Sequence, residues 1–200
     1  MRYMKRAYAM AWIFLPLVFL AGPIHAQDED VFAFIPAGGK MLLTQAVENA
    51  PADEVRALLT GTRDREKWSS YLQARKGALA GLKAFGPYEL LTLADYLAFN
   101  MPLAAKNVPA DPGRANWQKL LPPDGRDLVL DNCQFCHIIT VVVTQEKTND
   151  AWLGTMNSPS HVEIELNDRQ REAMASYLVL NANIPIDLVP EELRAGGASY

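Results

Sequence analysis

The chain has few of the residues that build metal clusters and covalent cross-links, with two cysteines and three histidines among its 200 residues. A structural zinc site takes about four Cys or His ligands. Only two residues separate the cysteines, so a disulfide between them would close almost no loop. The glycine-rich phosphate loop, the HExxH helix and the nucleophile elbow are also missing. These absences leave no support for a zinc-stabilised or disulfide-linked domain, a nucleotide-binding enzyme or the common hydrolases.

The two cysteines, Cys133 and Cys136, are followed at once by His137, which makes the CxxCH pattern of covalent c-type haem attachment. In such a site the two thiols form thioethers with the haem, and the histidine binds the iron as its proximal ligand. We therefore predict one covalent haem c on these three residues. A redox dithiol is an alternative, but it needs a strand before the CxxC, whereas residues 125–132 have a helical pattern. Another metal site is the second alternative.

The N-terminus has the pattern of a secretory signal. Three basic residues within the first six precede the mostly apolar stretch 7–22, and Ala26 offers a small residue for cleavage. We predict a signal peptide over residues 1–26 and a periplasmic location, where bacterial c-type cytochromes receive haem. The alternative is an uncleaved anchor, although the apolar stretch is shorter than the ~20 residues of a membrane span and Pro16 interrupts it.

Basic residues are scarce once the predicted signal is removed. The remainder carries 16 Lys and Arg against 23 Asp and Glu, a formal charge of −7. Such a protein has no electrostatic attraction to nucleic acid or to anionic lipid. We expect a redox partner with a basic docking face, no nucleic-acid partner, and membrane contact only if the signal stays uncleaved.

No part of the remaining chain alternates convincingly between apolar and polar residues, and apolar stripes and capping residues indicate helices. The predicted helices cover residues 51–59, 64–75, 87–99, 125–132 and 167–180. The β-branched run 138–143 is predicted to be an extended segment on the porphyrin edge. The predicted fold class is therefore all-α.

The two halves resemble each other, which indicates an internal duplication. Residues 36–43 align with 123–130, and each half continues with a tryptophan in a polar helix start, Trp68 and Trp152. In the first half, residues 47–51 stand in the place of the CxxCH and contain no cysteine or histidine. After the signal, we predict a haem-free domain over 27–106, a linker over 107–121 and a haem domain over 122–200.

The second half, over about residues 122–185, resembles the class I c-type cytochromes. The likeness lies in a helix that leads into CxxCH, a middle helix with Trp152 and Met156, and a closing helix with Tyr177 and Leu178. The resemblance implies a small cytochrome c-like, all-α domain around one covalent haem, with its first and last helices crossing. It also implies that the first half is a degenerate, haem-free copy of that domain.

Elimination leaves two candidates for the sixth iron ligand. Met41 and Met101 lie in or beside the haem-free half, and Met174 falls on the apolar stripe of the closing helix, where a core role is expected. Met156 is the first candidate, and His161 in the following loop is the alternative. A thioether ligand would raise the reduction potential, whereas a second imidazole would lower it.

These features predict a non-enzymatic electron carrier that passes single electrons between a periplasmic dehydrogenase and an oxidase or another carrier. No catalytic side chain is required, because the iron does the redox chemistry. Two alternatives remain open. One makes the chain a haem-bearing subunit of a larger redox complex, and the other a haem sensor or enzyme with an open sixth site.

Overall fold

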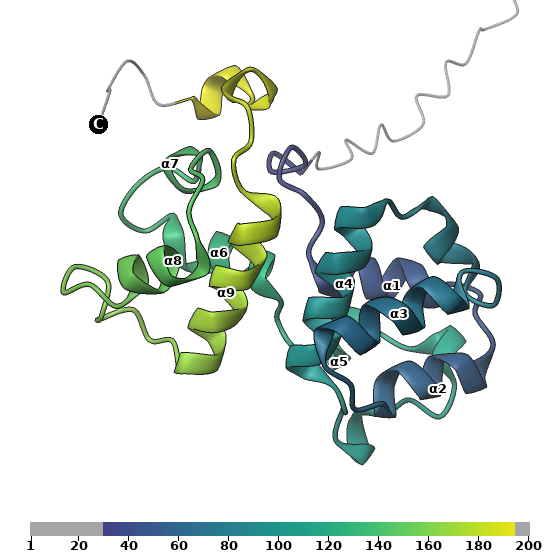
Figure 1. Ribbon diagram of the computed structural model, residues 1–200. Coiled ribbons are helices and arrows are strands. Elements are labelled where there is room, and N and C mark those ends of the chain that lie inside the picture. The colour runs from purple at the N-terminus through teal and green to yellow at the C-terminus, as the bar shows by residue number, and fades with distance from the viewer. Residues whose placement is uncertain (1–29, 195–200) are drawn as a thin grey trace, which may run out of the picture. The chain divides into compact units, whose positions relative to one another are not determined.

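The computed structural model describes residues 30–194 (Figure 1). All regular elements in this range are helices, which confirms the predicted all-α class. The part of the chain from Val31 onward forms one compact unit. Within the described residues, no helix has both the length and the apolar character to cross a membrane. The predicted signal peptide lies outside the described range.

Two groups of four main helices follow each other along the chain. The first lobe, residues 39–121, is built on α1 (Gly39–Val47), α2 (Ala52–Thr60), α3 (Arg65–Arg75), the 3₁₀ helix η1 (Ala80–Ala84) and α4 (Pro87–Asn100). It continues through η2 (Ala105–Asn107), η3 (Pro112–Arg114) and α5 (Trp117–Leu120). The second lobe, residues 122–194, is built on α6 (Gly125–Cys133), α7 (Thr140–Val143), α8 (Asn149–Met156) and α9 (Asp168–Asn181). It ends with η4 (Ile186–Leu188) and η5 (Glu191–Leu193).

Local signals explain where the helices begin. The side chain of Asp64 accepts a hydrogen bond from the N–H of Lys67 and caps α3. Pro87 lies in the first turn of α4, where its missing N–H costs nothing. Asn167 and Gln170 form a capping box at the start of α9. These helices, together with α2 and α6, confirm the predicted ones to within a residue at each end.

The prediction of an extended segment over 138–143 is wrong, because most of it forms the short helix α7. The N–H of Val143 donates to the carbonyl of Ile139 (3.1 Å), which closes a helical turn. Val142 and Val143 belong to the core of the second lobe. Valine disfavours a helix by at most about 0.7 kcal/mol, and so short an apolar run does not distinguish a strand from a buried helical turn. Burial therefore decides the conformation.

Each lobe contains the same close crossing of its first and last helices. In the first lobe, Gly39 of α1 lies against Tyr96 of α4, and an added Cβ would lie 2.1 Å from the tyrosine Cβ. In the second lobe, Gly125 of α6 lies against Tyr177 of α9, and the same distance would be 2.3 Å. Only glycine fits at either crossing, so the two crossings are equivalent.

This equivalence corrects the predicted alignment of the two halves. When the crossing glycines are matched, residue 36 pairs with 122, so the predicted match of 36–43 with 123–130 is wrong by one residue. The sequence match paired a proline and a glycine that the halves share. In the structure, the glycine of the first lobe that contacts the tyrosine is Gly39. The sequence does not show which glycine makes this contact, because the contact depends on how the two helices cross.

A second pair of contacts repeats in the same way. The N–H of Leu103 donates to the carbonyl of Leu59 at the end of α2 (2.8 Å). The N–H of Ile184 donates to the carbonyl of Val143 at the end of α7 (3.0 Å). Each hydrogen bond connects the segment that follows the closing helix to the second helix of its lobe. Helix α7 is therefore the shortened counterpart of α2.

Two tyrosine hydroxyls join the lobes reciprocally. The hydroxyl of Tyr96 donates to the carbonyl of Pro122, just before α6 (2.9 Å). The hydroxyl of Tyr177 donates to the carbonyl of Pro36, just before α1 (2.6 Å). Burial raises the pKa of both tyrosines, so both hydroxyls remain protonated donors at neutral pH.

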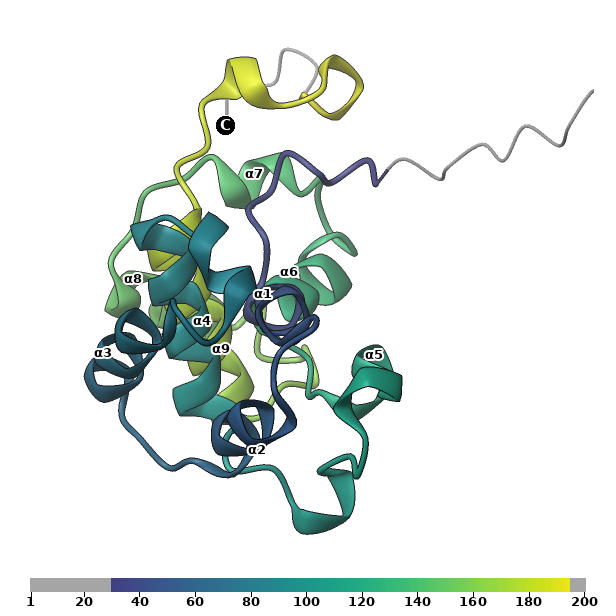
Figure 2. The same ribbon diagram turned by 90° about the vertical axis from the view of Figure 1, so that its right-hand side faces the viewer.

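The segments that lead into α1 and α6 are exchanged between the lobes. Ile35 packs in the core of the second lobe, and Leu121 packs in the core of the first. Between the lobes, α4 packs against α9 (Figure 2). Ile35 falls in the predicted 27–106 domain, so the core of the second lobe draws on the first half of the chain, whereas Leu121, in the predicted linker, completes the core of the first lobe.

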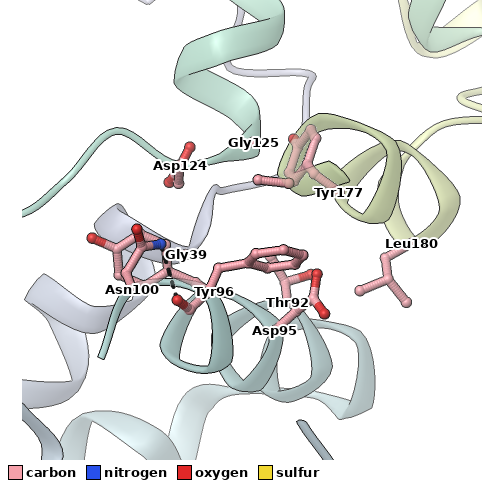
Figure 3. A pocket seen from close by; sticks show the side chains of 11 residues that line it. Gly39, Thr92, Asp95, Tyr96, Asn100, Asp124, Gly125, Tyr177 and Leu180 are labelled. Atoms are coloured by element: carbon pink, nitrogen blue, oxygen red, sulfur yellow. Dashed lines mark hydrogen bonds between the residues drawn. The ribbon is translucent and has the colours of Figure 1, made fainter. Parts of the chain in front are cut away.

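A small cavity of about 290 Å³ lies where α4 meets α9 (Figure 3). Beside it, the amide of Asn181 donates to the hydroxyl of Thr92 (3.1 Å). Burial raises the pKa of Asp95, while a hydrogen bond from Ser176 and the Arg65 guanidinium, 3.8 Å away, act in the opposite direction. Polar contacts between the two closing helices thus fix their relative position.

Replacing the crossing glycine of the second lobe should destabilise the protein. Gly125→Ala forces a methyl group into Tyr177 and the Ala173 carbonyl, so we expect the free energy of unfolding to fall by about 1–3 kcal/mol. Gly154→Ala in α8 is the control, because its methyl meets nothing within 4 Å. It should raise stability by up to about 1 kcal/mol. Urea unfolding of the full chain measures both, and equal or greater stability of Gly125→Ala would contradict the crossing.

Candidate functional site

Helix α6 brings the CxxCH to the wall of a cavity. The helix starts with a capping box between Asp124 and Asp127 and ends at Cys133. The next three residues form a turn, and His137 follows shortly before α7. Cys133, Cys136 and His137 all line the same cavity. The end of α6 therefore determines where all three side chains meet.

This cavity lies among α6, α7, α8, α9 and the loop that connects α8 to α9. It encloses about 710 Å³, part of which is open to solvent. Apolar side chains from α7, α8, α9 and this loop line it, among them Val141, Val142, Trp152, Ile164, Met174 and Leu178.

The donor set fits a covalently attached haem. Cys133 is half-buried and Cys136 is exposed, so the two thiols lie at the edge of the cavity. The Nδ1 atom of His137 is buried and has no hydrogen-bond partner among the described residues. Two thiols and one imidazole on the wall of an apolar cavity are the groups that c-type attachment uses.

The surroundings of Cys133 do not favour a redox dithiol. A reactive CxxC thiol lies at a helix N-terminus or beside a cation, which lowers its pKa. Cys133 is instead the last residue of α6. Burial raises the pKa of its thiol to about 11, so the thiol is protonated at neutral pH.

Both candidates for the sixth ligand line the same cavity. Met156 ends α8 and is 7% exposed. The ring of His161 lies 6.5 Å from the ring of His137, centroid to centroid, at an interplanar angle of 67°. The hydroxyls of Ser158 and Ser160 lie 2.9 and 3.1 Å from Nδ1 of His161, which leaves its Nε2 as the ring nitrogen outside this contact. Met156 and His161, the two candidates from the sequence, thus both reach the cavity, as does Met174.

The other methionines are distributed as the sequence suggested. Met41 is exposed on α1, and Met101 belongs to the core of the first lobe. Met174 is buried in the core of the second lobe and also lines the cavity. Its position on the apolar stripe of α9 gives it a packing role.

Sequence reasoning missed Arg171, a buried residue of α9 that is 6% exposed. Its guanidinium donates to the carbonyl of Met156 (2.5 Å) at the end of α8. It also donates to the carbonyls of Ile164 (2.8 Å) and Leu166 (3.3 Å). Arg171 thereby ties the loop that carries His161 to α9. A signal was available, because an arginine on the apolar stripe of a helix must find partners to be buried.

The tryptophan helices α3 and α8 are equivalent in the two lobes. Trp68 and Trp152 are each the fourth residue of their helix and are fully buried. The Arg63 guanidinium lies 4.5 Å from the Trp68 ring centroid, and the Lys147 ammonium lies 4.6 Å from that of Trp152. Both indole N–H groups are buried without a partner. The residue four positions after each tryptophan is therefore also equivalent.

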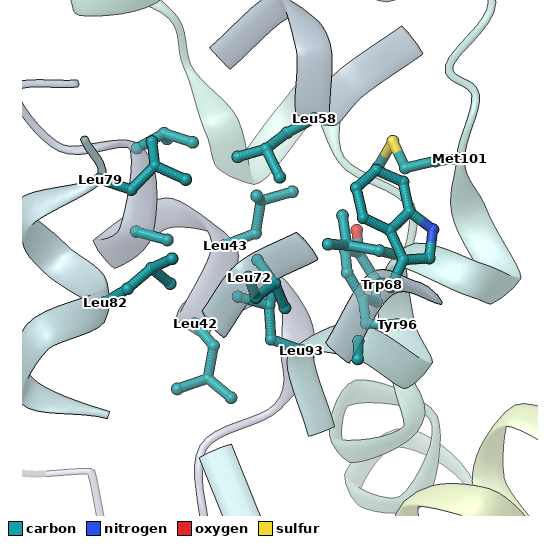
Figure 4. Packing of buried hydrophobic residues seen from close by; sticks show 14 of the residues in the cluster. Leu42, Leu43, Leu58, Trp68, Leu72, Leu79, Leu82, Leu93, Tyr96 and Met101 are labelled. Atoms are coloured by element: carbon teal, nitrogen blue, oxygen red, sulfur yellow. The ribbon is translucent and has the colours of Figure 1, made fainter. Parts of the chain in front are cut away.

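At the position that corresponds to the cavity of the second lobe, the first lobe has a packed core. Leu72 stands in the place of Met156, and Val47, the last residue of α1, stands in the place of Cys133. Neither cysteine of the chain lies in this lobe. Its interior is filled by fully buried leucines (Figure 4), among them Leu42, Leu43, Leu58, Leu79, Leu82 and Leu93. The counterparts of Cys133 and Met156 in the first lobe are thus apolar side chains within a leucine-filled core.

No protein-family model, curated protein or solved structure matches this chain. Across residues 30–194, no three His, Cys, Asp or Glu side chains are grouped as ligands for a bare metal ion. The case for the site therefore depends on the residues and the geometry described above.

Arg171→Lys should destabilise the second lobe and loosen the His161 loop. One ammonium cannot reach three carbonyls that point at a planar guanidinium, so we expect buried acceptors to be left unpaired at a cost of about 1–3 kcal/mol. Arg169→Lys, at an exposed position of the same helix, is the matched control and should be nearly neutral. Urea unfolding and amide hydrogen exchange at residues 157–166 measure the effect. Unchanged exchange in that loop would show that Arg171 does not hold it.

Proposed function

We propose that this protein is a periplasmic c-type cytochrome that carries single electrons on one covalently bound haem c. The observation that carries the proposal is the CxxCH of residues 133–137 on the wall of an apolar cavity that also contains Met156 and His161. A tether, a proximal imidazole and a choice of distal ligands are thus gathered at one site. The haem, when bound, supplies the one-electron chemistry.

The residues of the chain have separate tasks in this proposal. Cys133 and Cys136 would hold the haem through thioether bonds, and His137 would bind the iron. The apolar walls from α7, α8 and α9 exclude water, which tunes the reduction potential. Met156 or His161 would be the second protein ligand of the iron and would leave no position for a substrate. Electrons would come from, or go to, a periplasmic dehydrogenase, an oxidase or another carrier.

A visible spectrum of the purified full chain, produced with cytochrome maturation machinery, tests this function. We expect one haem per chain and a six-coordinate, low-spin spectrum in both oxidation states. A high-spin ferric spectrum together with carbon monoxide binding would instead make the protein a haem sensor or enzyme with an open sixth site. Copurification with a dehydrogenase in fixed stoichiometry would favour a subunit of a redox complex.

Cys136→Ala should leave at most one thioether bond and lower the yield of haem-loaded protein, because one of the two attachment points is lost. Gln134→Ala, between the cysteines, is the control and should retain both bonds. The reduced pyridine adduct reports the number of thioethers through its absorption maximum. An adduct spectrum of Cys136→Ala identical to that of the unaltered chain would reject the attachment model.

Met156→Ala should abolish the weak far-red band of the ferric protein that arises from sulfur bound to iron. The loss of a thioether ligand should also lower the reduction potential. His161→Ala is the matched variant and should keep both the band and the potential. If the band survives in Met156→Ala but the low-spin spectrum is lost in His161→Ala, the sixth ligand is His161.

A further inference from the structure

We propose that the surface around Phe135, Ile138 and Val162 is the docking face for a partner protein that presents apolar side chains inside a rim of Lys and Arg. We call these three residues the apolar patch. The inference rests on the proposed function and specifies its partner, because it places the contact beside the attached haem.

The apolar patch consists of large side chains that the fold leaves in solvent. Phe135 is 85% exposed, Val162 59% and Ile138 43%. Ile138 follows His137 directly, Val162 follows His161 directly, and the two histidine rings are 6.5 Å apart. Phe135 lies between the two cysteines. Each residue of the apolar patch is therefore next in the sequence to a residue that lines the candidate haem cavity.

The duplicated lobe provides an internal control for the patch. Counting back five residues from the equivalent pair Leu59 and Val143 matches Ile138, which precedes α7, with Glu54 of α2. The Glu54 side chain is mostly buried, and its carboxylate is paired with Arg75 (3.1 Å). An exposed isoleucine replaces this ion pair only in the lobe that carries the CxxCH. Exposed apolar side chains beside a site indicate an interaction surface.

The charge around the patch is mostly negative, and Lys147 is the single basic residue in residues 127–168. No Lys or Arg occurs in residues 127–146 or 148–168, whereas the two stretches contain seven Asp and Glu. Asp131 lies one helical turn before Phe135, and Glu163 is adjacent to Val162; both are exposed. A rim of this kind repels anionic lipid and nucleic acid and attracts a basic protein surface.

The rest of the molecule has the opposite balance. Residues 39–121 carry eleven Lys and Arg against eight Asp and Glu, whereas residues 122–194 carry five against twelve. The negative lobe is the one with the cavity, so the overall charge separation turns the patch toward a basic partner before contact. Electrostatic steering of this kind raises association rates by about 10-fold or more. An apolar centre with a polar, charged rim is the usual composition of an interface.

Electron transfer kinetics of the full-length holoprotein test the docking face, with basic mitochondrial cytochrome c as the protein probe. We expect the rate to fall about 10-fold or more when the ionic strength rises from about 10 mM to about 200 mM. Removing two charges in Glu163→Gln/Glu165→Gln should weaken this salt dependence. The matched control, Glu191→Gln/Glu192→Gln, removes two exposed charges from η5 of the same lobe and should leave it unchanged. Equal behaviour of the two double variants would overturn the proposal.

The apolar patch is tested separately from the charge. Phe135→Gln should slow the reaction with the protein probe about 10-fold, as expected when a central interface residue is lost. It should leave unchanged the rate with hexaammineruthenium(II), a small cation that needs no apolar contact. Equal slowing with both reagents would indicate an effect on the haem and would contradict docking.

A binding measurement separates failure of this proposal from failure of the proposed function. Amide chemical shifts of the full chain are followed as the basic protein is added, which requires no haem. We expect chemical-shift changes confined to residues 131–138 and 160–165, whether or not this chain carries haem. Shifts elsewhere, none at all, or self-association of the chain through this surface in sedimentation would overturn the docking face.

Discussion

The close approach of α6 and α9 at Gly125 and Tyr177 is the constraint on which the rest of the site depends. The close contact fixes the position of α6 on α9. The last residue of α6 is Cys133, so the contact also positions the first thiol of the CxxCH. The hydroxyl of the same tyrosine holds the Pro36 carbonyl, so the chain that leads into the first lobe is anchored at the same crossing. Positioning of the attachment motif and joining of the lobes are thus achieved by one side chain.

The two lobes share one arrangement of helices but differ in the side chains that pack inside it. In each, a glycine–tyrosine crossing, a buried tryptophan with a cation over its ring, and a backbone bond after the closing helix recur. Leucines close the interior of the first lobe, so its stability needs no cofactor. The second lobe instead keeps a partly open, apolar cavity beside its CxxCH. A large, flat apolar cofactor that occupies it would complete the core.

Much of the fold and of the site could be predicted from the sequence, because the signals were local. Caps such as Asp64 and Asn167 and the proline at residue 87 gave the helix ends, and the CxxCH together with elimination gave the residues that line one cavity. What could not be predicted depends on contacts between distant parts of the chain. Helix α7 is stabilised by burial and not by propensity, and Arg171 takes its role from three carbonyls that meet only in the folded loop.

The most direct test of the central claim is extraction of the purified, full-length protein with acidified organic solvent after production with maturation machinery. Thioether bonds survive this treatment, whereas a haem held only by its iron ligands is released. The account predicts that the colour stays with the precipitated protein and that Cys133 and Cys136 resist alkylation. A colourless product, or colour that moves into the solvent, would contradict it.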